Sequence, residues 1–342
     1  MDIKKWQERL DWFFFKQRLY MPIVPYVLKL GYKAGSLSFF TAANPGLKNG
    51  GFVNASKYDV LRQIMPAYLP KTLFVNPQQP KQMVTEALKT QEWHKFPLIL
   101  KPDIGERGHG VKKINISEEL AHHLDRIKSG HLLQEFVDLP LEFCILYYRM
   151  PDSGQGEISS IGFKDFLKVT GDGRSTLYEL IIQDDYILQN INLELYLKRH
   201  SSYLNTIPLS GQELRITDVA SRGTGVLFKN FNHLYSKELV HTFDRISRNV
   251  DGFYYGRFDV KATSFESLVK GEGIKILELN GVNGQPIHCY DPLFTQEQFV
   301  QELKRHWQII FDISIENIKT HKLKPRLGNL LKEISIHISR HQ

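Results

Sequence analysis

The sequence contains little cysteine, and its cysteines do not form a metal-binding pattern. Cys144 and Cys289 are the two cysteines of 342 residues, and neither belongs to a CxxC or zinc-ligand spacing. A small secreted scaffold held by disulfides would carry more of them. We therefore expect a reduced, cytoplasmic protein.

Long apolar runs are also missing. No stretch reaches the roughly 18 apolar residues that a membrane-spanning helix requires. The aromatic run at residues 13–15 is short and Lys16 ends it, so the sequence predicts no signal peptide.

Nucleic-acid and nucleotide fingerprints of the common kinds are absent. The chain has no dense Lys/Arg block, zinc-finger spacing or GK[ST] P-loop, although its net charge is +7. A modest basic excess suits nucleotides, acidic substrates or anionic lipid headgroups, and we expect no nucleic-acid partner. With 42% hydrophobic residues, the chain can build a large core in two or three lobes.

The expected elements alternate irregularly along the chain. Strand-like runs, helical stretches and glycine turns do not follow a regular βαβ order, and residues 177–206 look like a charged helical insertion. This pattern favours α+β lobes around mostly antiparallel sheets over a doubly wound domain.

A glycine-rich loop follows a strand that ends at Lys101. The loop carries Gly105, Gly108 and Gly110, which allow backbone N–H groups to approach phosphate oxygens. A lysine at the strand end would add a point charge for phosphate. The alternative is an ordinary surface loop.

Two further strands carry polar pairs spaced two residues apart. GRFDV places Arg257 and Asp259 on one face, and ELN places Glu278 and Asn280 on one face. If the strands pair, two carboxylates and an amide oxygen meet, and such hard oxygen ligands suit Mg²⁺. The alternative is a structural salt bridge of Arg257 with Asp259 or Glu278.

A third segment, LLQEFVDLPLEF, ends a buried strand with an acidic residue. Glu135, Glu142 and nearby backbone groups could bind an adenine edge and a ribose. In isolation, each is more readily explained as a solvated loop acid.

In this order, the segments resemble the ATP-grasp superfamily, most of all the D-alanine–D-alanine ligase and cyanophycin-synthetase branches. VTGDGRSTLYELI, residues 169–181, is similar to a segment of cyanophycin-synthetase-type enzymes, and Lys164 stands where a basic residue often precedes it. The resemblance covers roughly residues 54–292. It implies an α+β, ATP-grasp fold of two lobes that grip ATP, with a short atypical N-terminal region at 1–72, a small lobe at 73–138 and a large lobe at 139–342.

The resemblance also implies a role for each matching residue. Arg257 would steady an acyl phosphate and a tetrahedral intermediate, and Asp259, Glu278 and Asn280 would be metal ligands for Mg²⁺, expected as two ions. ATP would be bound by Lys57, Lys101, Gly105, Gly108, Gly110, Glu135, Phe136, Val137, Glu142 and Lys164. Arg222, beside two glycines, and His288, near the metal strand, are candidate substrate-binding residues.

These roles predict an ATP-dependent ligase that joins a small-molecule carboxylate to an amine through an acyl phosphate. Two alternatives stay open, namely a small-molecule kinase on the same fold and a membrane-peripheral nucleotide-binding protein without turnover. The shortened N-terminal region and the sequence GVNGQPIHCYDP after ELN differ from the D-alanine ligases, so the substrates do not follow from the resemblance.

The N-terminal region has its own pattern. Residues 12–33 mix aromatic and aliphatic side chains with spaced lysine and arginine, as interfacial segments do. One interpretation is peripheral contact with the inner membrane face. The other is that the aromatics pack on the lobes or form a homodimer interface.

Overall fold

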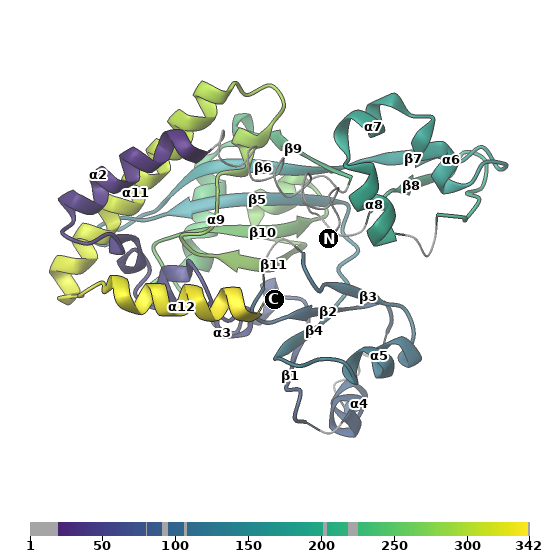
Figure 1. The fold of residues 1–342 in the computed structure, drawn as a ribbon, viewed down its shortest axis with the longest axis horizontal. Coiled ribbons are helices and arrows are strands. Elements are labelled where there is room, and N and C mark those ends of the chain that lie inside the picture. The colour runs from purple at the N-terminus through teal and green to yellow at the C-terminus, as the bar shows by residue number, and fades with distance from the viewer. Residues whose placement is uncertain are drawn as a thin grey trace, which may run out of the picture. The chain divides into compact units, whose positions relative to one another are not determined.

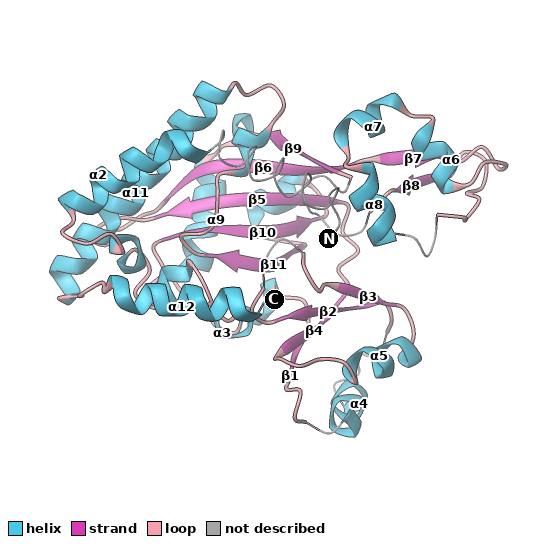
Figure 2. Ribbon diagram, in the orientation of Figure 1, coloured by secondary structure: helices cyan, strands magenta, loops and turns pink. Residues whose placement is uncertain are grey.

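The chain is mixed helix and sheet (Figure 1, Figure 2). The computed structural model describes residues 20–79, 81–90, 95–105, 108–200, 204–217 and 225–340. It divides into two compact units that interleave in sequence. Unit 1 comprises Met1–Leu69, Phe143–Gly162 and Asn230–Gln342, and unit 2 comprises Pro70–Glu142 and Phe163–Lys229.

A five-stranded sheet has the order β11-β10-β5-β6-β9. Its strands are β5 (Leu141–Tyr148), β6 (Glu157–Phe166), β9 (Val226–Asn230), β10 (Tyr255–Ala262) and β11 (Ile274–Asn280). β10 and β11 are antiparallel neighbours, with a bulge between Asp259 and Val260. The α+β class predicted from the irregular alternation is confirmed.

The helices of unit 1 are α2 (Val24–Lys33), α3 (Lys57–Leu61), α9 (Lys237–Ser247), α10 (Phe265–Lys270), α11 (Gln296–His321) and α12 (Leu327–Arg340). The 26-residue helix α11 begins with a capping box, in which Thr295 and Gln298 satisfy each other's backbone N–H groups. Leu30 and Phe39 pack with Ile310, Ile313 and other buried side chains into one core. Pro25 lies in the first turn of α2, where its missing N–H costs nothing.

Unit 2 contains a four-stranded sheet of order β1-β4-β2-β3. Its elements are β1 (Thr72–Val75), α4 (Lys81–Thr90), β2 (Leu98–Pro102), β3 (Lys112–Ile114), α5 (Ser117–Leu124) and β4 (His131–Glu135). The pairings β1–β4, β2–β4 and β2–β3 are all antiparallel. Leu98, Leu100 and Leu133 form the core between this sheet and its helices, together with buried residues of α4 and α5.

The stretch 177–206, expected to be a helical insertion, is described apart from residues 201–203. It holds α6 (Leu177–Ile182), α7 (Asp185–Asn190) and α8 (Leu193–His200) beside the two-stranded sheet of β7 (Lys168–Thr170) and β8 (Glu213–Arg215). A capping box of Thr176 and Glu179 begins α6. These elements have their own buried cluster, in which Val169 and Ile181 contact Tyr196 and other apolar side chains. Across the described ranges, no helix has the length and apolarity needed to cross a bilayer.

Candidate functional site

The strand pairing brings the four predicted polar residues together. In the β10–β11 register, Asp259 lies directly opposite Glu278, and Arg257 lies directly opposite Asn280. The alternate residues Phe258 and Leu279 are buried on the other face. Because side chains two apart on a strand share a face, both carboxylates, the guanidinium and the carboxamide lie on one side of the sheet.

Arg257 is held by its neighbours on this face. Its Nε donates to Asp259 Oδ1 at 2.7 Å, and its Nη1 donates to the carbonyl of Gln285 at 3.4 Å. Burial lowers the pKa of Arg257, but the Asp259 carboxylate outweighs this effect and the net pKa is raised. The guanidinium is therefore a permanent cation in a fixed position, and the predicted alternative of an Arg257–Asp259 salt bridge is present in this structure.

Lys57 reaches the same face from another element. Its Nζ lies 3.5 Å from Glu278 Oε1, and the two side chains are 15% and 27% exposed. Lys57 is the first residue of α3 because Ser56 caps the helix by accepting a hydrogen bond from Asp59 N. This contact places a second cation beside the carboxylate pair, still partly open to solvent.

Asn280 has an unsatisfied polar atom. Its Nδ2 is buried and has no hydrogen-bond partner among the described residues. A buried amide without a partner is costly, and such atoms often mark a place where an ion or ligand binds. A half-turn of the carboxamide would point its oxygen in the same direction.

The oxygen ligands on this face suit Mg²⁺, but they would fill only part of its coordination sphere. Asp259, Glu278 and Asn280 offer hard oxygen atoms on one face. The described part of the chain has no group of three or more His, Cys, Asp or Glu that could hold a metal ion. An ion here would take its remaining ligands from phosphate oxygens and water, which is how Mg²⁺ is commonly held at nucleotide sites.

In unit 2, Lys101 lies near the end of β2, as predicted. Its Nζ donates to Gln134 Oε1 at 2.9 Å, and Gln134 Nε2 donates to Thr72 Oγ1 at 2.9 Å. Lys101 and Gln134 are both buried. This hydrogen bond orients the ammonium group, which suits an anion-binding role.

The glycine loop after β2 contains two positions that demand glycine and one that does not. Gly108 and Gly110 have φ values of +69° and +74°, whereas Gly105 does not have a positive φ. A Cβ on Gly110 would meet Pro102 Cγ at 2.8 Å, but a Cβ on Gly105 would make an ordinary contact with Pro102 at 3.5 Å.

This difference predicts unequal costs for two matched substitutions. We expect Gly110→Ala to lower the free energy of unfolding by about 1–3 kcal/mol, because alanine is strained in the left-handed region. Gly105→Ala should change it by less than about 0.5 kcal/mol, as surface substitutions usually do. Urea denaturation of both variants checks this; equal losses would contradict the described loop geometry.

The predicted ATP-binding residues of the segment LLQEFVDLPLEF have different environments. Glu142 forms a buried ion pair with Lys164, at 2.6 Å, so these two predicted ATP-binding residues lie together. The Glu135 carboxylate accepts a hydrogen bond from the backbone of Lys71 at 3.3 Å. Val137 is buried. Lys113 Nζ lies 4.5 Å above the ring of Phe136.

His288 lies deep in unit 1 and is 1% exposed. Its Nδ1 is 2.7 Å from Ser160 Oγ, its Nε2 is 3.6 Å from Glu302, and its ring packs edge-on against Phe294. Desolvation, followed by the charge of Arg305, lowers the pKa of His288 to about 4. The other predicted substrate residue, Arg222, falls outside the described residues.

The buried histidines make stability depend on pH. Burial lowers the pKa of His288 to about 4 and that of His306 to about 3, from the ordinary 6.5. Below pH 6.5 the unfolded chain binds these protons and the folded chain does not, so stability falls as pH falls toward the folded values. We expect His288 alone to cost about 2 kcal/mol between pH 6.5 and about pH 5. Urea denaturation at several pH values gives the free energy of unfolding across this range. We expect this free energy to depend less steeply on pH in His288→Gln than in wild type. An identical pH dependence in the two chains would contradict a buried neutral imidazole.

The site predicted from the sequence did not include the residues that hydrogen-bond and pack against the ends of β10 and β11. Asn44 is fully buried; its side chain donates to the carbonyls of Gly50 and Tyr255 and accepts from the N–H groups of Tyr254 and Tyr255. A Cβ on Gly281 would lie 2.4 Å from the Gly50 carbonyl oxygen, so only glycine permits this approach. The turn-rich run NPGLKNGG was the available signal.

Comparisons with known proteins give structural likenesses only. No family model matches the chain. No curated protein matches it in sequence. Similar solved structures include VanG D-Ala:D-Ser ligase from Enterococcus faecalis (9% identity, TM-score 0.42, 76% of this chain and 61% of that one). They also include D-alanine–D-alanine ligase from Bacillus anthracis (13% identity, TM-score 0.43, 78% of this chain and 68% of that one). A third is a bifunctional glutathione synthetase from Pasteurella multocida (14% identity, TM-score 0.36, 77% of this chain and 38% of that one).

The chain thus spans less than two thirds of the VanG and glutathione synthetase chains. At such identities and TM-scores the function has to be argued from the residues of this chain.

Proposed function

We propose that this protein is an ATP-dependent ligase that joins a carboxylate to an amine and releases ADP and phosphate. The observation that supports it most is the face of β10 and β11 on which Asp259 opposes Glu278 and Arg257 opposes Asn280. This combination supplies hard ligands for a nucleotide-bound cation and a fixed guanidinium beside them. Each of these four residues stands at the corresponding position of the ATP-grasp motifs that the sequence resembles.

Each unit offers groups that suit nucleotide phosphates. In unit 2, Lys101 has an oriented ammonium group, and Gly108 and Gly110 give the loop the backbone conformations that phosphate-binding loops use. In unit 1, Asp259, Glu278 and Asn280 would hold Mg²⁺, which supplies neutralisation of the charge on the transferred phosphoryl group. Lys57, beside Glu278, adds a cation to the same face.

The chemistry follows from these groups in two balanced steps. A carboxylate oxygen of the acid substrate attacks the γ-phosphorus and ADP leaves, which gives an acyl phosphate. The amine nitrogen then attacks the acyl carbon, phosphate leaves and the nitrogen loses a proton. Arg257 would stabilise the oxyanion of the tetrahedral intermediate, since its charge is permanent and its orientation is fixed by Asp259 and the Gln285 carbonyl.

Arg257 also favours ligation over the kinase alternative. A kinase needs a base or a positioned hydroxyl acceptor at the γ-phosphate, whereas a ligase needs a cation directed at an acyl oxygen. The cation on the β10 face is an arginine two residues before a proposed metal ligand, which suits stabilisation of an acyl oxyanion.

The proposal is tested by supplying a cell extract of small molecules with ATP, Mg²⁺ and the purified full chain. We expect a product whose mass is that of a carboxylic acid plus an amine minus water, together with one ADP and one phosphate per product. The Lys101→Ala variant should form none of it. A phosphorylated metabolite as the sole ATP-dependent product would establish the kinase alternative.

A further inference from the structure

Helix α2 presents apolar side chains to solvent. Val24, Leu28 and Tyr32 recur every four residues, so they share one face of the helix, and they are 41%, 51% and 87% exposed. Met21, in the 3-10 turn that precedes α2, is 55% exposed. Surface helices of globular proteins usually turn polar residues outward.

This apolar stripe is not the face by which α2 packs on the protein. Leu30 is buried in the core of unit 1, and Tyr26 donates a hydrogen bond to Gln308 of α11 at 2.8 Å. On a helical projection these residues lie on the side opposite Val24, Leu28 and Tyr32. The helix therefore has an apolar face toward the core and a second, uncovered apolar face among the described residues.

A basic cluster adjoins the C-terminal end of this helix. α2 runs parallel to α11, because Tyr20 contacts Phe299 near the start of α11 and Ser36 Oγ donates to the carbonyl of Pro325 beyond its end. The last residues of both helices thus lie at the same end of unit 1. The cluster consists of the exposed residues Lys29, Lys33, Lys319, Lys322, Lys324 and Arg326.

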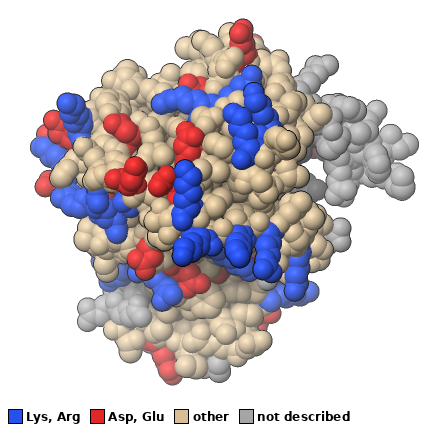
Figure 3. All heavy atoms as spheres, turned by 90° about the vertical axis from the view of Figure 1, so that its left-hand side faces the viewer, with Lys and Arg blue, Asp and Glu red and all other residues tan. Residues whose placement is uncertain are grey.

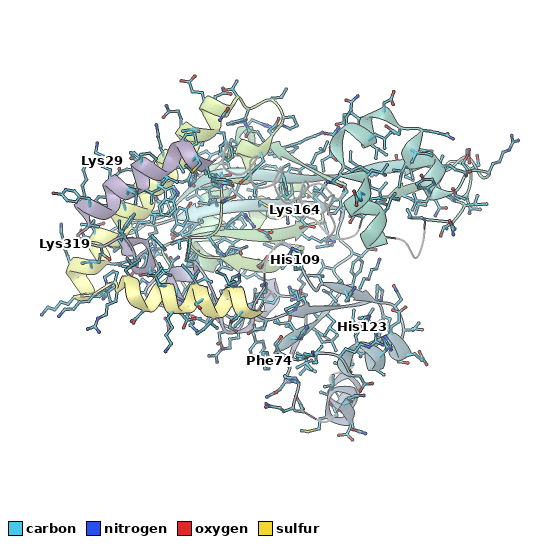
Figure 4. All side chains as sticks on the ribbon, in the orientation of Figure 1. Lys29, Phe74, His109, His123, Lys164 and Lys319 are labelled. Atoms are coloured by element: carbon cyan, nitrogen blue, oxygen red, sulfur yellow. The ribbon has the colours of Figure 1, made fainter. Side chains whose placement is uncertain are left out.

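The two helices lie side by side, and the Lys29 and Lys319 side chains project at the same end of the pair (Figure 1, Figure 4). The face that carries this end is crossed by a band of Lys and Arg side chains (Figure 3). Neither residues 20–58 nor residues 317–332 contain an aspartate or glutamate. Within these two ranges the positive charge is not offset, and the acidic residues directly beyond their ends are Asp59, Glu316 and Glu333.

We propose that the apolar stripe of α2 and this basic cluster form a docking surface for an anionic lipid membrane. Exposed aliphatic and aromatic side chains flanked by lysines are the combination that binds the headgroup boundary of a bilayer. The positive charge is complementary to anionic headgroups, which attract basic residues near the surface. A second copy of the chain is a poorer occupant, because a two-fold interface on this stripe would bring two basic clusters together.

The expectation from the sequence named residues 12–33, of which 12–19 lie outside the described residues. Of that segment, the proposed surface uses residues 21–33. It also includes the basic residues between 319 and 326, which the sequence did not connect to this helix. The docking surface shares no residue with the proposed ligase site.

The test is flotation of the full chain with vesicles. We expect binding to vesicles of equal parts phosphatidylcholine and phosphatidylglycerol, and little binding to phosphatidylcholine alone. Leu28→Ser with Tyr32→Ser should reduce the partition coefficient at least about tenfold, since most of the apolar surface that would insert is removed. Lys319→Gln with Lys322→Gln should reduce it about 25-fold, because each basic residue near an anionic surface contributes roughly fivefold.

The matched control is Lys237→Gln with Lys270→Gln, which removes the same charge from α9 and α10 and should bind like wild type. Circular dichroism should show all variants to be folded. Three results would each overturn the proposal: no binding of the wild-type chain to anionic vesicles, equal binding by all variants, or a dimer in sedimentation that the stripe substitutions dissociate while lipid binding is absent.

Discussion

Replacing Glu278 with glutamine should lower the rate of ATP-dependent product formation by about a thousandfold while the chain stays folded. A bound metal supplies several kcal/mol of charge stabilisation to phosphoryl transfer, and each 1.36 kcal/mol corresponds to a factor of ten. Glu278 lies directly opposite Asp259 and beside Lys57, so its charge is central to the set. The measurement is initial rate of ADP release with wild-type and variant chains.

A second readout separates metal binding from turnover. Mg²⁺ with ATP should raise the melting temperature of the wild-type chain through ligand linkage, and the Glu278→Gln variant should lose most of this rise. The matched control is Glu272→Gln, the same chemical change at an exposed residue just before β11, and it should behave like wild type. A full Mg²⁺-dependent rise in the Glu278→Gln variant would remove this residue from the proposed metal set.

Replacing Arg257 with alanine should cost on the order of 10²–10³ in kcat/KM, the loss typical of a missing oxyanion donor. The guanidinium is fixed by Asp259 and by the Gln285 carbonyl, so the substitution removes a charge that is already positioned before substrate binds. Steady-state kinetics with the identified carboxylate and amine provide the measurement.

The conservative variant distinguishes catalysis from stability. Alanine at position 257 removes the guanidinium that pairs with the buried Asp259, which is expected to lower stability as well. Arg257→Lys keeps a positive charge but loses the planar fork, so it should recover part of the rate. If lysine restores stability but gives no higher rate than alanine, the planar guanidinium and not the charge alone is needed for catalysis. Wild-type rates in both variants would show that Arg257 has only a structural role.

The strand-borne part of the candidate site was predictable because its signal is local. The period-two spacing of Arg257 with Asp259 and of Glu278 with Asn280 is enough by itself to assign each pair to one face. The sequence left open whether the two strands pair. In the structure β10 and β11 are antiparallel neighbours, and their register brings the four residues together. Lys101 near the end of β2 was predicted in the same way.

The remaining contacts join residues far apart in sequence, and no local pattern encodes them. Gln134, which orients Lys101, reads in the sequence as an ordinary residue of a buried strand. The Glu142–Lys164 pair depends on two strands whose relative register the sequence does not specify. Likewise, residues 44–51 were interpreted only as part of an atypical N-terminal region, whereas they pack against Gly281 at the end of β11.

Hydroxylamine trapping distinguishes an acyl-phosphate intermediate from a phosphate monoester product. Hydroxylamine reacts with acyl phosphates to give hydroxamates, so the full chain is incubated with ATP, Mg²⁺, hydroxylamine and the carboxylates that stimulate ADP release. We expect an ATP-dependent hydroxamate of one of these acids, seen by mass spectrometry and strongly reduced in Lys101→Ala and Glu278→Gln. A stable phosphate monoester, with no hydroxamate from any carboxylate that stimulates ADP release, would contradict the ligase assignment.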